Sequence, residues 1–127
     1  RTNSGIVFDS STGFTLPNGA VRSPDAAWVS NAQWQSLTDE QKHEEFSPLA
    51  PAFVVELRSS SDSIEKLREK MQEYLSNGVL LGWLLDSKTK QVEIYRSGES
   101  AERLEAPTTL SDESLLPGFV LNLQKVW

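Results

Sequence analysis

The sequence has no cysteine, and it has a single histidine among its 127 residues. Without cysteine there is no disulfide framework, no thiolate zinc site and no cysteine nucleophile, and a lone histidine excludes a metal site built from several imidazoles. His43 lies in a polar run, and no histidine lies near the serine cluster at 59–61, which disfavours a serine hydrolase. If the protein binds a metal ion, oxygen atoms must hold it.

The sequence also lacks any apolar run of about 18 residues and any segment with the charge and apolar order of a signal peptide. These two absences predict a soluble cytoplasmic protein with no membrane partner. Basic residues are in the minority, with 12 Lys and Arg against 18 Asp and Glu, a net charge of −6. Such a chain is a poor nonspecific ligand for DNA, so nucleic acid would have to meet a local basic patch or a bound cation.

A chain of 127 residues suits one compact domain, which we assign to residues 1–127. Asn18-Gly19 predicts a hairpin turn, and the polar stretch 31–49 predicts one or two short helical turns. A helix is expected from Asp62 or Ser63, where Asp62 and Glu65 have capping-box spacing, to the stop at Gly78. Strands are predicted at 52–59, 79–86, 91–96, 101–110 and 119–127. This order favours an α/β or α+β fold with a mixed sheet and one major helix.

Two carboxylates stand at positions that favour chemistry. Asp25 follows a proline at the start of an apolar strand pattern, and Glu56 lies inside the strand pattern "AFVVELRS". Because side chains alternate along a strand, Glu56 and Arg58 share one face with Val54. Two adjacent carboxylates repel unless a cation lies between them, and Mg²⁺ is the usual solution where phosphate is attacked. Asp25 and Glu56 are therefore candidate metal ligands.

A positive charge near an attacked phosphate is the remaining requirement of such a site. Arg58 could supply it, and so could Lys66 or Lys70, which lie one turn apart on the predicted helix with Tyr74 one further turn along. Ordinary structural roles compete with each assignment. Pro24-Asp25 is a common turn, Glu56 could pair with Arg58 in a salt bridge, and the lysines could be solvent-exposed partners of neighbouring glutamates.

The segments "SPDAAWVS" and "VVELRSSSD" resemble the PD-(D/E)XK motif of the restriction-endonuclease-like superfamily, with arginine at the position of the motif lysine. Together with "KMQEYLSNGVLLGWLLD" and "LPGFVLNL", they resemble the bacterial Uma-type family of restriction-endonuclease-like proteins along nearly the whole chain. The resemblance implies a restriction-endonuclease-like core, a mixed β-sheet with flanking helices. Family members usually carry an additional N-terminal region, so the chain is expected to lack the N-terminal part of the fold.

The resemblance implies an endonuclease that hydrolyses DNA phosphodiester bonds with Mg²⁺ or Mn²⁺ and an activated water. Asp25 and Glu56 would then be metal ligands, with the backbone carbonyl of Leu57 a third. Lys70 is the first candidate for the relocated motif lysine, followed by Lys66 and Arg58, and Tyr74 is a candidate for orienting a phosphate or water. Since such folds commonly cut duplex DNA as two copies, a homodimer is one hypothesis. The alternative is a catalytically degenerate module that binds nucleic acid or a protein partner.

Overall fold

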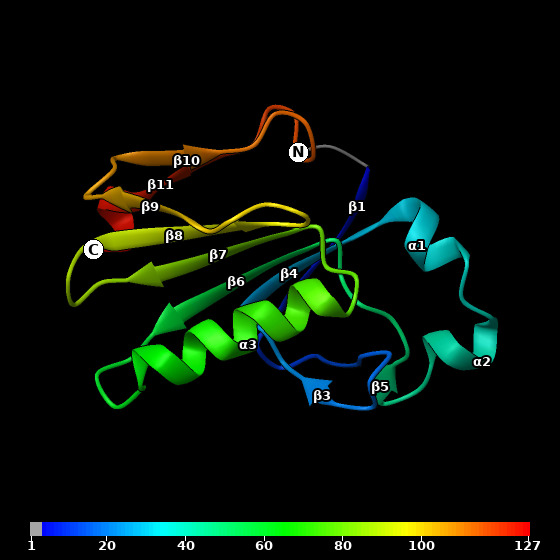
Figure 1. The fold of residues 1–127 in the computed structure, drawn as a ribbon. Coiled ribbons are helices and arrows are strands. Elements are labelled where there is room, and N and C mark those ends of the chain that lie inside the picture. Colours follow the sequence, from blue (N-terminus) through cyan, green and yellow to red (C-terminus); the bar gives the residue numbers. More distant parts are fainter. Residues whose placement is uncertain (1–3) are drawn as a thin grey trace.

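The computed structural model describes residues 4–127, which form a mixed sheet with one long helix across it (Figure 1). The strands are β1 (Gly5–Asp9), β2 (Gly13–Thr15), β3 (Val21–Arg22), β4 (Ala26–Ser30), β5 (Phe46–Ser47), β6 (Phe53–Arg58), β7 (Leu81–Asp86), β8 (Gln91–Arg96), β9 (Glu102–Glu105), β10 (Thr109–Ser111) and β11 (Val120–Asn122). The helices are α1 (Asn31–Gln35), α2 (Asp39–Lys42), α3 (Ile64–Ser76) and the 3₁₀ turn η1 (Leu123–Lys125).

The main sheet has six strands in the order β1-β4-β6-β7-β8-β9. Strands β6 and β7 are parallel and are connected by α3, whereas every other neighbouring pair in this sheet is antiparallel. A helix is the usual connection between adjacent parallel strands, because the chain must return to the same end of the sheet. The mixed sheet predicted from the order of sequence patterns is confirmed.

Helix α3 covers one face of the central strands. Its buried residues Leu67, Met71 and Tyr74 recur at helical spacing and pack in a cluster with Val54 and Leu84 from the sheet. Gly82 on β7 allows this close approach, since a Cβ there would lie 2.6 Å from Cε of the only methionine in the chain. The opposite face of the sheet, with Phe53 and Val55, packs against the C-terminal strands β10 and β11 and the turn η1.

The hairpin turn at Asn18-Gly19 is confirmed: Gly19 has a φ of +89°, and Leu16 N–H bonds Ala20 O at 2.8 Å. Short helical turns were predicted between 31 and 49, one or two of them, and the structure has two, α1 and α2. The capping box at Asp62 was wrong. Ser63 caps α3 by accepting from Lys66 N–H, while Asp62 accepts from the backbone and hydroxyl of Ser59.

The strand predicted at 119–127 was too long, because pairing with β10 ends at Asn122. The Asn122 side chain then accepts from Gln124 N–H and starts the turn η1, so a local cap replaces the ladder. Within residues 4–127, no helix is long and apolar enough to cross a membrane.

Candidate active site

Glu56 lies on β6 beneath helix α3, with only 4% of its surface exposed. Two groups from α3 meet the same carboxylate oxygen, Oε2. The Tyr74 hydroxyl donates to it at 2.7 Å, and the Lys70 ammonium lies 3.2 Å away. Lys70 and Tyr74 are one helical turn apart, so both side chains descend from the same side of α3. The two strongest partners of Glu56 thus come from the helix and not from its own strand.

Burial raises the pKa of the Glu56 carboxyl, because a low-dielectric site disfavours the anion. The hydrogen bond from Tyr74 and the charge of Lys70 act in the opposite direction, while the nearby charge of Asp25 adds to the increase. Burial also raises the pKa of the Tyr74 hydroxyl well above its ordinary value, and the adjacent Glu56 charge adds to this. Tyr74 therefore stays a hydrogen-bond donor at every physiological pH.

Asp25 lies in the bend between Pro24 and strand β4. Its Oδ2 accepts a hydrogen bond from the backbone N–H of Leu57 at 2.7 Å. This contact follows from the register of β4 against β6, in which Ala26 is opposite Val55, so Asp25 reaches the end of β6 where Glu56 lies. The sequence prediction that the two carboxylates approach each other agrees with this placement and with the electrostatic effect of Asp25 on Glu56.

Arg58 does not pair with Glu56, so the salt bridge considered from the sequence was wrong. Its Nη1 donates to Oδ2 of Asp86 at 2.8 Å, and both side chains are mostly buried. The reason lies in the sheet register, since Asp86 on β7 is directly opposite Arg58 on the parallel strand β6. A direct cross-strand neighbour is closer than a side chain two residues along the same strand.

Lys66 and Lys70 have different surroundings on α3. Lys66 is exposed, and within residues 4–127 its ammonium makes no ion pair. Lys70 is half-buried and reaches Glu56. Among the cations proposed from the sequence, Lys70 is the one that the structure brings to the candidate carboxylate, whereas Arg58 is engaged by Asp86 and Lys66 faces solvent.

The comparisons with known proteins can now be set beside this geometry. The model of the Uma2 family, described as "Putative restriction endonuclease", matches residues 1–124. The chain belongs to this family. No curated protein matches the chain. The family resemblance drawn from the sequence motifs is confirmed by a match over nearly the full length.

Solved structures give the fold of this Uma2-family member independently. A crystal structure described as a "putative nuclease belonging to DUF820" from Anabaena variabilis ATCC 29413 matches with a TM-score of 0.80 and 18% identity, over 97% of this chain and 68% of that chain. This likeness places the chain in the restriction-endonuclease-like fold class. A cryo-EM structure of a DrdV–DNA complex matches with a TM-score of 0.46 and 13% identity, over 81% of this chain and 8% of that chain.

Mg²⁺ or Mn²⁺ is the ion that the family implies, and the donor atoms can be tested for fit. Asp25 and Glu56 each use one carboxylate oxygen in the contacts above and keep a second oxygen, and hard oxygen donors are what these ions prefer. Among residues 4–127, no three acidic or histidine side chains lie so that they could hold a metal ion together. Two carboxylates completed by water and phosphate suit Mg²⁺, which usually keeps several waters. The donors present therefore fit the ion.

Sequence reasoning missed two polar clusters that fix helix α3. On one side, Glu73 of α3 accepts from Arg22 at 2.6 Å and from Asn18 at 3.1 Å, which ties the β2–β3 hairpin to the helix. On the other side, Arg68 of α3 forms a bidentate pair with the buried Glu93 of β8. The Arg68–Glu93 pair could have been anticipated in part, because Glu93 lies inside an apolar strand pattern, as Glu56 does, and a carboxylate buried there needs a partner.

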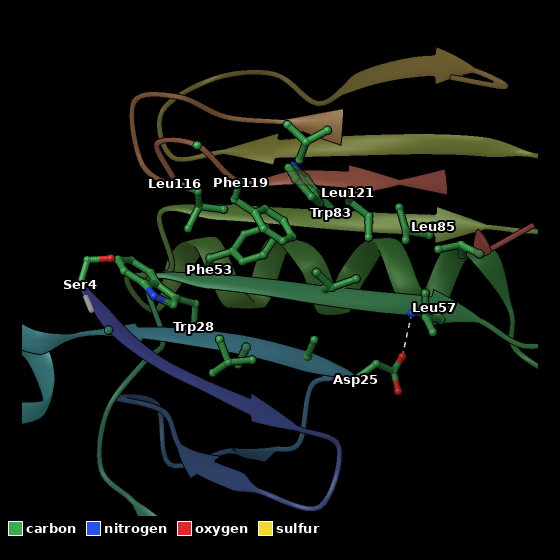
Figure 2. A pocket seen from close by; sticks show the side chains of 18 of the residues that line it. Ser4, Asp25, Trp28, Phe53, Leu57, Trp83, Leu85, Leu116, Phe119 and Leu121 are labelled. Carbon is green, nitrogen blue, oxygen red and sulfur yellow. Dashed lines mark hydrogen bonds between the residues drawn. The ribbon is translucent and has the colours of Figure 1, made fainter. Parts of the chain in front are cut away.

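An apolar groove of about 690 Å³ lies on the sheet face opposite α3 (Figure 2). Trp28, Phe53, Trp83 and Phe119 contribute to its lining, and Asp25 is the one charged residue that lines it in the described part of the chain. Glu56 points to the other face of the sheet, toward Tyr74 and Lys70. Among residues 4–127, no basic side chain lines this groove. Lys70, the cation that reaches the Glu56 carboxylate, lies on the α3 side of the sheet.

Proposed function

We propose that this protein is an endonuclease that hydrolyses DNA phosphodiester bonds with Mg²⁺ or Mn²⁺. The observation that carries the proposal is the buried Glu56 carboxylate with the Lys70 ammonium 3.2 Å away, in a chain that belongs to a family of restriction-endonuclease-like proteins. A carboxylate buried in a core strand is costly, and its retention beside a second carboxylate and a cation is typical of a functional site.

In this proposal Asp25 and Glu56 hold the ion through their carboxylates, with the Leu57 carbonyl as a further oxygen donor. When bound, the ion would lower the pKa of a water ligand and stabilise the charge that develops on the phosphate. Tyr74 fixes the orientation of Glu56 by donating to Oε2, which leaves Oε1 for a ligand. Because this contact comes from the helix, the position of α3 determines the geometry of the carboxylate.

Lys70 would supply the positive charge next to the phosphate. It would replace the motif lysine, because the corresponding position on β6 holds arginine. The motif position holds Arg58, and a guanidinium is a poor proton acceptor that can neutralise charge but cannot serve as a base. Arg58 is moreover engaged by Asp86. Lys66, exposed on the preceding turn of α3, is the weaker alternative to Lys70 for contacting substrate. Cleavage of both strands of a duplex would use two copies, so the proposal includes a homodimer on DNA.

The direct test is nicking of supercoiled plasmid by the 127-residue chain in Mg²⁺, Mn²⁺ or EDTA. The Asp25→Ala/Glu56→Ala variant is compared with wild type and with Glu44→Ala/Glu45→Ala, which removes two exposed carboxylates after α2. All three proteins are purified identically, so a contaminating nuclease would act equally in each. The proposal expects metal-dependent nicking by wild type and the control, and none by the site variant.

A second candidate function is a nuclease-fold module that binds nucleic acid or protein without cutting. Two observations favour it. Asp25 Oδ2 accepts a hydrogen bond from the Leu57 N–H, and Arg58, at the position of the motif lysine, is paired with Asp86. Equal nicking by all three proteins, or none by any of them, would favour this module over the nuclease.

A further inference from the structure

We propose that the turn joining β7 to β8, residues 87–90, contacts the phosphate backbone of the DNA substrate through Lys88 and Lys90. This inference rests on the proposed nuclease function, since it assigns a substrate-binding surface to the same protein. It concerns residues that neither the PD-(D/E)XK pattern nor the Glu56 cluster includes.

The turn lies at the same edge of the sheet as the candidate site. Strands β6 and β7 are parallel, and Arg58 at the end of β6 is opposite Asp86 at the end of β7. The loop that leads into α3 and the turn 87–90 therefore leave the sheet at one edge, as Figure 1 shows. Asp25 bonds Leu57 at this edge as well. DNA that reached the candidate carboxylates would pass close to the turn.

The turn is anchored to the strand that carries Glu56. Asp86, 6% exposed, accepts from Arg58 Nη1 with Oδ2 and from Lys88 N–H with Oδ1, at 2.8 and 3.0 Å. Thr89 also hydrogen-bonds the Asp86 side chain. At the other end of the turn, Lys90 O accepts from Ala106 N–H at 2.7 Å. The two lysines are therefore presented from a backbone fixed relative to β6 and not from a loose tip.

Lys90 has a left-handed backbone, with a φ of 57°. Glycine normally takes such a position at the end of a hairpin turn because it has no Cβ, and asparagine is tolerated there because its short side chain can hydrogen-bond locally. A strained residue on an exposed turn is a reason to look for a function. Lysine adds no packing at this site, since its side chain is exposed. What it adds is a positive charge.

Both ammonium groups are available to a ligand. Residues 87–90 are all exposed, and within the described part of the chain neither Lys88 nor Lys90 forms a salt bridge. Asp86, the acid that precedes the turn, is paired with Arg58. The turn thus presents two exposed lysines on a chain with a net charge of −6. Two flexible ammonium groups suit phosphates as point charges, without reading the base sequence.

The test is the affinity of the full 127-residue chain for a fluorescein-labelled 20-base-pair duplex, measured by anisotropy in Ca²⁺ at several salt concentrations. The variants are Lys90→Glu, Lys88→Glu/Lys90→Glu and the neutral pair Lys88→Gln/Lys90→Gln. Lys42→Glu on α2 is the matched control, because it reverses one lysine at the far end of the molecule (Figure 1). Circular dichroism and urea unfolding establish that each variant is folded.

We expect the double reversal to weaken binding by ten-fold or more, and the neutral pair to lower the salt dependence of log K by about one per lysine removed. Lys42→Glu should change affinity less than two-fold. Wild-type binding with an unchanged affinity in the double reversal would overturn the role of the turn while leaving the nuclease proposal standing. If wild type neither binds the duplex nor nicks plasmid, the function and the surface fail together.

Discussion

Replacing Tyr74 with phenylalanine tests whether the buried carboxylate depends on the helix. The substitution removes one hydroxyl and leaves the ring in place among its buried neighbours, so packing changes little. The lost hydrogen bond, 2.7 Å from the Tyr74 hydroxyl to Glu56 Oε2, is made to a charged group. Such bonds contribute about 1.5–3 kcal/mol. Because Lys70 remains as a partner, we expect the free energy of unfolding at pH 8 to fall by about 2 kcal/mol.

The pH dependence of this loss follows from the direction of the pKa shift. Burial raises the pKa of Glu56 in the folded protein, so the folded state binds the proton more tightly than the unfolded chain does. Stability therefore falls as pH rises from the ordinary glutamate value through the raised pKa. Without the Tyr74 hydroxyl the folded pKa rises further, and this fall becomes larger. The cost of Tyr74→Phe should thus be greater at pH 8 than at pH 5.

Tyr95→Phe is the matched control, because the Tyr95 hydroxyl donates to Glu93 Oε1 at 2.6 Å. Burial raises the pKa of Glu93, but the bonds from Arg68 and Tyr95 outweigh it and hold the pKa below its usual value. Because the pKa of Glu93 is lowered whereas that of Glu56 is raised, the cost of Tyr95→Phe should change less between pH 5 and pH 8 than the cost of Tyr74→Phe. Urea unfolding of wild type and both variants at pH 5 and 8 measures these costs. Equal pH dependence for the two variants would refute the reasoning.

Three further outcomes are expected. Lys70→Met should bind Mn²⁺ several-fold more tightly in calorimetry, because the substitution removes a positive charge that competes with the ion for Glu56. The same variant should nick plasmid more slowly. Lys66→Met should change neither the affinity for Mn²⁺ nor the nicking rate. Arg58→Met should lower the free energy of unfolding by about 3 kcal/mol in urea titrations, because the buried carboxylate of Asp86 loses its partner, whereas a loss below about 1 kcal/mol would show that the pair is not buried in solution. Gly82→Ala should cost about 1 kcal/mol in the same assay, since the new Cβ displaces the methionine methyl, and an unchanged stability would contradict the close approach of α3.

The strand faces and the main helix were predictable because they depend on local periodicity. Alternation along β6 places Phe53 and Val55 in one cluster and Val54 in the other, as the pattern "FVVELR" indicates. The stripe of α3 and the stop at Gly78, with a φ of +105°, follow from the same local signals. Lys70 was singled out as a cation candidate because the family motif directed attention to "KMQEY".

The pairing of the charged residues could not be predicted, because it depends on register between strands far apart in sequence. Arg58 pairs with Asp86, 28 residues away, only because β6 and β7 are aligned in parallel at those positions. From the sequence alone, the partner that strand alternation suggests for Arg58 is Glu56, two residues earlier on the same face. The Arg22–Glu73 pair joins residues 51 apart because the β2–β3 hairpin contacts helix α3, which is also a long-range arrangement. The hydrogen bond from the Leu57 N–H to Asp25 Oδ2 is also a contact between distant residues, so no sequence pattern predicts it. It occupies one of the two carboxylate oxygens that a metal ion could use.

The most direct measurement of the central claim is the binding of Mn²⁺ to the 127-residue chain by calorimetry, without DNA. We expect one site on wild type whose affinity for Mn²⁺ falls at least ten-fold in Asp25→Ala and in Glu56→Ala separately, while Glu44→Ala/Glu45→Ala leaves the affinity unchanged. Binding that survives the loss of either Asp25 or Glu56, or a wild-type protein that binds no Mn²⁺, would contradict the claim that these two carboxylates form one metal site.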